Sequence, residues 1–297
     1  MGYINGAASD PLRLLDSLQS GYLLAIAVAV VLPAIRLALD RAVLSPVGRW
    51  ALIPPYKKSD EQPTKEELNR LHKWKESAWK ALVYCGLVAL ELYVCVNERF
   101  FSDTRYFWLG CTRFPPCTYP VSRGLRLLYS LQMGFYLQAV PSLVFWEVRR
   151  KDFWESMAHH FATLGLIVYS YQVNFVKIGA MVFLCHDIND IFLEAAKMAR
   201  YAQQKHAPNV LFVAFMLSWF ASRIFYFPVY LIRSVYYEPI ELVAKVYNIN
   251  PHPHWEIFLA LLCFLFALHL YWSYLILKVI VKQIRNGTPD DVREDDD

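Results

Sequence analysis

Residues 210–232 read VLFVAFMLSWFASRIFYFPVYLI, an apolar run in which Arg223 is the only charged side chain. A helix of about 20 mainly apolar residues is long enough to cross the roughly 30 Å hydrocarbon core of a membrane. Several other windows have comparable length and character, so the sequence predicts about seven membrane spans. They occupy residues 22–39, 77–96, 125–148, 157–173, 178–199, 210–232 and 254–281.

The composition excludes other classes of protein. Of the 297 residues, 56% are hydrophobic and 19% are charged, against roughly 25% charged in ordinary soluble domains. Aromatic residues make up 16% of the chain, which excludes intrinsic disorder. The net charge of +4 is small and scattered, so we expect no nucleic-acid partner. The six cysteines form no CxxC pair.

Polar residues lie inside the predicted spans. Glu91 falls in the second window, and Gln132 and Gln138 fall in the third. Polar groups at that depth face protein or water rather than lipid. We therefore predict an all-α polytopic membrane protein with about seven transmembrane helices, six of which form a bundle around a polar central cavity.

The distribution of Lys and Arg predicts the orientation of the chain. These residues are concentrated in segments 40–76, 147–155, 197–208 and 278–297, and positive charge marks the cytosolic side of a membrane. We therefore expect a cytosolic C-terminus and an N-terminus on the other side. Pro33 and Arg36 are expected to end the first span early.

The chain divides into three predicted parts. Residues 1–75 contain the first span and a cytosolic loop, and residues 76–285 contain the helical bundle and its site. Residues 286–297 form an acidic cytosolic tail that we expect to be solvated.

Ionisable residues are concentrated between residues 157 and 201. Because an ionisable side chain inside a membrane is costly, each is a functional candidate. Helical spacing of three and four residues predicts that four of them share roughly one face: His186, Asp187, Asp190 and Glu194. The preceding span runs antiparallel and carries His159 and His160. We expect both to join the same polar seam, with His160 nearer to the cytosolic mouth and His186 deepest.

A zinc site is the main alternative interpretation of this cluster, because His and Asp both bind zinc. However, HH and HxxxD are not common zinc signatures, and no Cys joins the cluster. A di-iron hydroxylase would need clustered histidine boxes, and the remaining histidines are too scattered: His72, His206, His252, His254 and His269. We therefore expect no metal.

At these residues the sequence resembles the Lag motif of the ceramide synthases, a group within the TLC-domain family, and in particular their plant-like branch. The matching positions are His159, His160, Ser170, Tyr171, Gly179, His186, Asp187, Asp190, Glu194, Ala195, Ala196 and Lys197. The segments 145–153, 218–228 and 269–272 are similar to that family as well. The resemblance extends from about Glu76 to the acidic tail.

The resemblance implies transfer of a fatty acyl group from acyl-CoA to the amine of a sphingoid long-chain base, giving a (dihydro)ceramide in the endoplasmic reticulum membrane. The N-terminus would then be luminal. Acyl-CoA is a co-substrate, and no cofactor is expected. Association as a homodimer or heterodimer is also implied.

The chemistry assigns expected roles to the cluster. The amine must lose a proton before it attacks a thioester, and a His can accept that proton while a carboxylate orients the ring. The expected catalytic residues are His186, His159, His160, Asp187 and Asp190, with Asp190 as the carboxylate that orients His186. The expected substrate-binding residues are Arg149, Arg150, Lys151, Asn189, Arg223 and Glu194. Arg149, Arg150 and Lys151 would dock the CoA phosphates, and Asn189 could stabilise the oxyanion.

Two structural expectations complete the prediction. Arg223 and the carboxylates lie at similar depth, so we expect Arg223 to pair with Asp187 or Asp190. Cys111 and Cys117 flank Pro115 and Pro116 in a loop outside the membrane, and either a disulfide or two free thiols is compatible with the sequence.

Two other functions remain alternatives. A non-enzymatic TLC-domain protein, translocon-associated or lipid-sensing, would not need the intact set of His and Asp residues. A transporter would expose its polar seam to the two sides of the membrane in turn. An acyltransferase instead predicts a cavity open to the cytosol and to lipid.

Overall fold

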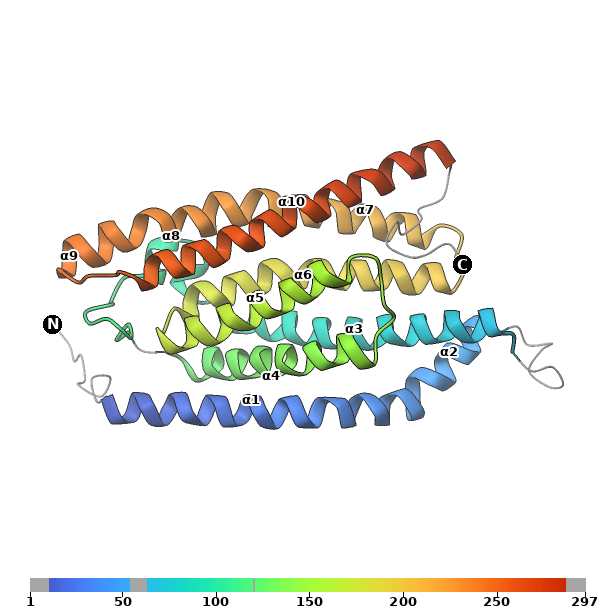
Figure 1. Cartoon of the computed structure of the whole chain (residues 1–297), viewed down its shortest axis with the longest axis horizontal. Coiled ribbons are helices and arrows are strands. Elements are labelled where there is room, and N and C mark those ends of the chain that lie inside the picture. Colours follow the sequence, from blue (N-terminus) through green and yellow to red (C-terminus); the bar gives the residue numbers. More distant parts are fainter. Residues whose placement is uncertain (1–10, 54–62, 120, 287–297) are drawn as a thin grey trace.

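A computed structural model describes residues 11–53, 63–119 and 121–286, and these residues form helices and connecting segments without a β-strand. Most of the acidic tail predicted at 286–297 lies outside them. Seven long helices are arranged roughly side by side (Figure 1). They are α1 (Pro11–Leu39), α3 (Lys65–Cys95), α4 (Arg123–Phe145), α5 (Phe153–Gln172), α6 (Val176–Tyr201), α7 (Ala207–Trp219, extended to Tyr247) and α10 (His254–Asn286).

The six helices after α1 form a bundle, and α1 lies against its outer side along α4 (Figure 1). The contact with α4 is close because Gly134 has no side chain: a Cβ there would lie 2.7 Å from the carbonyl oxygen of Ala25. Within the bundle, α6 packs against α3 and α7, and α5 packs against α4 and α10. The predicted arrangement of one outer helix and a six-helix bundle is confirmed.

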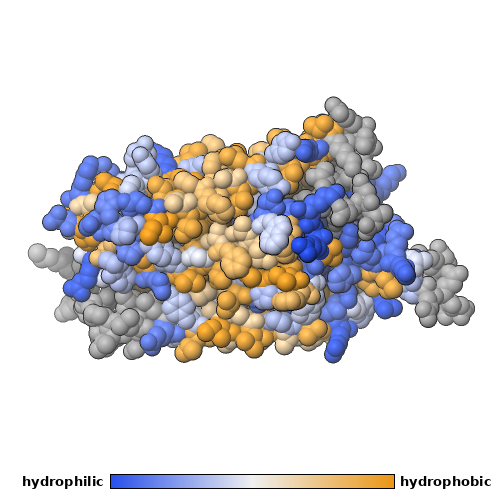
Figure 2. Space-filling model, viewed as in Figure 1, coloured by the Kyte–Doolittle hydropathy of each residue, from blue (hydrophilic) through white to orange (hydrophobic). Residues whose placement is uncertain are grey.

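Hydrophobic residues form a band across the middle of the molecule, with hydrophilic residues at both ends (Figure 2). Among the described residues, four helical stretches are long and apolar enough to cross a membrane: Gln19–Leu52, Lys65–Cys95, Ala207–Tyr247 and His254–Val281. The polar residues predicted to face the interior are buried: Glu91 on α3, and Gln132 and Gln138 on α4. This chain is a multi-pass membrane protein.

Two predicted boundaries were wrong. Pro33 does not end the first helix, which continues to Leu39 and then through a π-helical turn into α2 (Ser45–Leu52). Arg36 is buried instead, with its guanidinium 4.5 Å from the ring centroid of Trp146. The helix predicted to end at residue 232 continues to Tyr247, where Asn248 stops it in the left-handed conformation with φ 52°.

The two ends of the bundle differ in what they carry. The α4–α5 loop and the C-terminal end of α10 lie at one end, here called the α4–α5 end (Figure 1). The α5–α6 turn lies at the other, here called the α5–α6 end. There, Cys111 and Cys117 are bridged with 4.9 Å between their Cα atoms, so the disulfide alternative is confirmed.

Candidate active site

The α5–α6 hairpin brings the predicted histidines together. Asn174 takes a left-handed conformation with φ 61° at the turn, which Asn tolerates better than most residues. Its side-chain amide donates to the carbonyl of Cys117 at 2.5 Å, so the disulfide loop holds the turn. The two helices then run antiparallel, and the ring centroids of His159 and His186 lie 6.2 Å apart. The predicted seam between the two helices is present.

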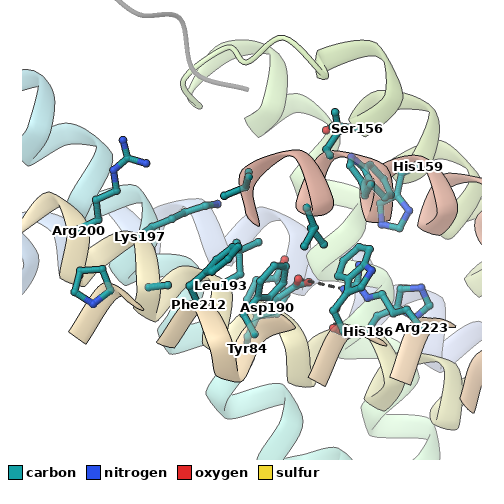
Figure 3. Close-up of a pocket in the computed structure, with 18 of the residues that line it drawn as sticks. Tyr84, Ser156, His159, His186, Asp190, Leu193, Lys197, Arg200, Phe212 and Arg223 are labelled. Atoms are coloured by element: carbon teal, nitrogen blue, oxygen red, sulfur yellow. Dashed lines mark hydrogen bonds and ion pairs between the residues drawn. The ribbon is translucent and has the colours of Figure 1, made fainter. Parts of the chain in front are cut away.

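A cavity of about 240 Å³ opens beside these rings, lined by residues of all six bundle helices. Figure 3 shows His159 on one side of it and His186, Asp190 and Arg223 on the other. Its polar and aromatic wall consists of Tyr84, Tyr136, Ser156, His159, His160, His186, Asp190, Lys197, Arg200, Trp219, Arg223 and Trp272. The rest of the wall is apolar and consists of Leu193 and Ala196 of α6, Pro208, Phe212 and Phe215 of α7, and Leu275, Ile276 and Val279 of α10.

His159 is the central aromatic contact of the cavity wall. Its ring centroid lies 5.7 Å from that of His160 and 5.4 Å from that of Trp272, with the Trp272 ring nearly perpendicular. Trp272 is held in turn by Asp152 at the start of α5, whose Oδ2 accepts from the indole N–H at 3.2 Å. His159 is therefore enclosed by aromatic and imidazole rings on the cavity wall.

His186 is held at both ring nitrogens. Its Nδ1 lies 2.7 Å from the carbonyl oxygen of Val182, and its Nε2 lies 2.9 Å from Nε2 of His269. Asp190 was expected to orient this ring, and that expectation was wrong, because a backbone carbonyl one turn earlier takes that place. The sequence excludes His269 from a di-iron histidine box, and no role is predicted for it in this cluster, although it belongs to the 269–272 segment of the resemblance.

Arg223 joins the site from the helix that follows α7. Its Nη2 donates to the backbone carbonyl of His186 at 2.9 Å and to Oδ1 of Asp190 at 3.2 Å. The guanidinium also lies 4.3 Å from the ring centroid of Trp219. The predicted pairing of Arg223 with one of the carboxylates is confirmed, and the partner is Asp190.

Asp187 does not line the cavity. Its Oδ2 accepts from Nε2 of Gln132 at 2.6 Å, and the same amide nitrogen donates to Oε1 of Glu91 at 2.7 Å. Around the helix, Asp187 is rotated by about 100° from His186 and about 60° from Asp190. This rotation directs it toward Gln132 of α4 and Glu91 of α3 and not into the cavity. The expectation that Asp187 shares the face of His186 and Asp190 was wrong.

Asn189 and Glu194 are also absent from the cavity wall. Asn189 donates from Nδ2 to the carbonyl of Cys185 at 2.9 Å and to Oγ of Ser222 at 2.6 Å, which ties α6 to the helix that follows α7. Glu194 accepts from Nζ of Lys197 at 2.9 Å. The structure thus places both in helix packing and ion pairing.

The basic residues at the α4–α5 end fall into two groups. Arg149 lies over the ring of Phe153 at 4.4 Å, and Arg150 pairs with Glu76 at 3.5 Å. Neither of them, nor Lys151, is on the cavity wall. Lys197 and Arg200 of α6 are on the wall. Lys197 and Arg200 are three residues apart at the end of the polar face of α6, and this spacing could have predicted that both face the cavity. The sequence prediction assigned neither of them a role.

No metal site is evident in the part of the chain that the structure describes. Within residues 11–53, 63–119 and 121–286, no three His, Cys, Asp or Glu side chains come together closely enough to hold a metal ion. The site is therefore a group of histidines, one carboxylate–guanidinium pair and a partly apolar cavity.

Comparison with known proteins identifies relatives over most of the chain. The TLC domain model matches residues 73–278. Ceramide synthase 1 LOH3 of Arabidopsis thaliana is 38% identical over 270 residues, which cover 90% of this chain and 88% of that protein. ASC1-like protein 1 of Oryza sativa is 38% identical over 90% of this chain and 86% of its own length. Ceramide synthase hyl-1 of Caenorhabditis elegans is 34% identical over 77% of this chain and 62% of its own length.

Proposed function

Because the chain belongs to the TLC-domain family, and within it to the ceramide synthases, we propose that it transfers a fatty acyl group from acyl-CoA to the amine of a sphingoid long-chain base. The product is a (dihydro)ceramide, and the membrane is that of the endoplasmic reticulum. The observation that carries the proposal is the cavity itself, where two histidines of α5 and one of α6 meet beside an apolar wall.

The reaction needs a base at the place where the two substrates meet. The nitrogen of the neutral amine attacks the thioester carbonyl carbon, the C–S bond breaks, and CoA leaves as a thiolate that takes up a proton. The amine gives up the protons that its attack requires, and an imidazole is the side chain suited to accept one near neutral pH. His159 is the leading candidate because it lies on the wall with its ring facing His186.

His186 and Arg223 serve the site differently. Both ring nitrogens of His186 are engaged by protein groups, so we assign it to shaping the wall opposite His159. Arg223 and Asp190 form a fixed pair beside it. Because Asp190 is on the wall, it can also meet the cationic amine before the proton is lost.

A covalent route through an acyl-imidazole is an alternative to direct attack. On this geometry an adduct on His186 would require Nε2 to leave His269, so the covalent route belongs to His159 or His160. Incubation with acyl-CoA alone, followed by intact and peptide mass spectrometry, distinguishes the routes. An acyl mass on α5 that disappears when the base is added supports the covalent route, and its absence supports direct attack.

The ends of the cavity fit the two parts of acyl-CoA. Lys197 and Arg200 are at the α4–α5 end, which we take as cytosolic, and they suit the phosphates of CoA. The apolar residues of α7 and α10 suit an acyl or sphingoid chain, because such a chain gains about 0.8 kcal/mol for each CH₂ removed from water.

Purified protein in lipid vesicles, given acyl-CoA and sphinganine, tests the proposal. We expect an N-acylated product and free CoA in equal amounts, detected by mass spectrometry and by thiol titration. The control is the His159→Ala variant in the same vesicles. If wild-type protein gives no product across a series of acyl-CoA lengths, the non-enzymatic and transporter alternatives take the place of the enzyme.

A further inference from the structure

His269 lies outside the cavity wall but contacts the site directly. It belongs to α10, and its side chain is fully buried. Its Nε2 lies 2.9 Å from Nε2 of His186 on α6, with 4.8 Å between the ring centroids. Aromatic rings enclose its other sides: Phe227 at 4.9 Å, Trp219 at 6.1 Å and Phe266 at 6.4 Å between centroids.

The hydrogen bonds fix which nitrogen of each ring carries a proton. A carbonyl oxygen only accepts, so the contact with Val182 requires a proton on Nδ1 of His186. In a neutral ring, Nε2 of His186 then has a lone pair and no proton. The proton in the contact between the two imidazoles must therefore come from Nε2 of His269.

This assignment agrees with the remaining nitrogen. Nδ1 of His269 makes no hydrogen bond of normal geometry among the described residues, although the ring also lies close to a backbone group of Arg223. A neutral His269 that carries its single proton on Nε2 has no proton on Nδ1, so Nδ1 requires no acceptor. A single proton, donated by Nε2 of His269 to Nε2 of His186, therefore accounts for the contact between the two rings.

We propose that His269 is a positioning residue that fixes the imidazole of His186 through this donated hydrogen bond. A hydrogen bond at Nδ1 restrains rotation of the imidazole about its bond to Cβ, and a second hydrogen bond at Nε2 restricts the ring further, because both nitrogens must then keep their partners. Val182 and His269 supply the two partners, and Arg223 holds the backbone carbonyl of His186. The ring therefore keeps an angle of 25° to His159 across the cavity wall. This inference rests on the proposed acyl transfer.

The test compares substitutions that keep or remove the donor. In His269→Gln the amide nitrogen can reach about the place of Nε2 and donate to His186. In His269→Leu the volume is similar and the donor is lost. We expect His269→Leu to lower kcat by about 10–100-fold, the size expected from the loss of one buried hydrogen bond that orients a functional side chain. KM for both substrates should change little, and His269→Gln should recover most of kcat.

Two controls separate positioning from packing. Phe266→Leu changes the packing around His269 and keeps its hydrogen bond, so kcat should stay close to the wild-type value. His269→Asn gives a second polar comparison if His269→Leu does not fold, because its amide is too short to reach His186. It should behave like the donor-less variant while His269→Gln does not.

Each outcome has a definite meaning. A folded His269→Leu protein with wild-type kcat overturns the inference, and so does a His269→Gln protein no better than His269→Leu or His269→Asn. Absence of acyl transfer by the wild-type protein is a separate result that overturns the proposed function instead. Folding of each variant is checked by its thermal unfolding in detergent.

Discussion

Two sides of α6 carry aspartates that are three residues apart in sequence and have different surroundings. On the cavity face, Asp190 pairs with Arg223 beside an open volume that a substrate can enter. On the other face, Asp187 accepts a hydrogen bond from Gln132, which also donates to Glu91. None of these three side chains lines the cavity. Both aspartates belong to one motif. The difference shows that a motif can combine residues that form the site with residues that hold the helix in its place.

The largest expected effect is on the cavity face. His159→Ala should lower kcat/KM by about 10²–10⁴-fold, the usual contribution of a proton-transferring side chain. His186→Ala should lower it by a similar factor, and the double variant should be little worse than the poorer single variant, because groups that act together are not additive. Initial rates in vesicles measure this.

His72 supplies the control for these histidines, because it is exposed on α3 away from the cavity. His72→Ala should leave kcat/KM unchanged. Near-wild-type turnover in a folded His159→Ala protein would remove His159 from the mechanism.

The second prediction compares the two aspartates directly. Asp190→Asn leaves Arg223 without its counter-charge at the wall, so it should lower kcat by about 10–100-fold, the size expected from a charge-assisted hydrogen bond of about 1.5–3 kcal/mol. Asp187→Asn keeps an oxygen that can accept from Gln132, so it should change kcat little. Asp187→Ala should instead lower the free energy of unfolding by about 1–3 kcal/mol, since one N–H of the buried Gln132 amide loses its acceptor while the contact with Glu91 remains.

Rates per folded molecule and thermal unfolding, measured on the same preparations, separate the two effects. Equal loss of kcat in Asp190→Asn and Asp187→Asn would contradict the assignment of Asp187 to the packed face.

These two faces also show how far the sequence could go. The apolar windows predicted the helices because length and hydrophobicity decide a membrane span, and depth matching predicted the pairing of Arg223. Spacing along α6 could not separate Asp187 from Asp190. The helix contacts several neighbouring helices, and sequence spacing does not show which neighbour each polar side chain faces. His269 was missed because its relation to His186 depends on how α10 crosses α6, which local periodicity does not encode.

The third prediction concerns the α4–α5 end. Replacing Lys197 and Arg200 with Gln should raise KM for acyl-CoA by about 10-fold, because two charge–phosphate contacts screened by water at the cavity mouth, worth about 0.7 kcal/mol each, together give a factor of ten. KM for the sphingoid base should change much less. The companion variant replaces Arg149, Arg150 and Lys151 with Gln. We predicted these to dock CoA, and the structure places Arg150 in an ion pair with Glu76.

Salt dependence sharpens this comparison, since contacts between charges that solvent can reach weaken as ionic strength rises. KM for acyl-CoA measured at several salt concentrations should depend on salt less in the Lys197 and Arg200 variant than in the wild type. If only the Arg149–Lys151 variant changes KM, the CoA phosphates bind at the loop and not at the wall.

The smallest effect is expected at the α5–α6 end, far from the cavity mouth. The loop closed by Cys111 and Cys117 meets the α5–α6 turn through two contacts, from the backbone N–H of Cys117 to Val173 at 3.0 Å and from Asn174 to Cys117 at 2.5 Å. A bridge over so short a loop stabilises a protein by about 2 kcal/mol through the entropy of the unfolded chain. Replacing both cysteines with Ser should therefore lower the thermal midpoint by a few degrees and leave kcat nearly unchanged, because the histidines lie along the helices and not at the turn. A reductant should lower the midpoint of the wild type by a similar amount and should not affect the variant. A midpoint that responds to neither change would show that packing of the loop alone holds the turn.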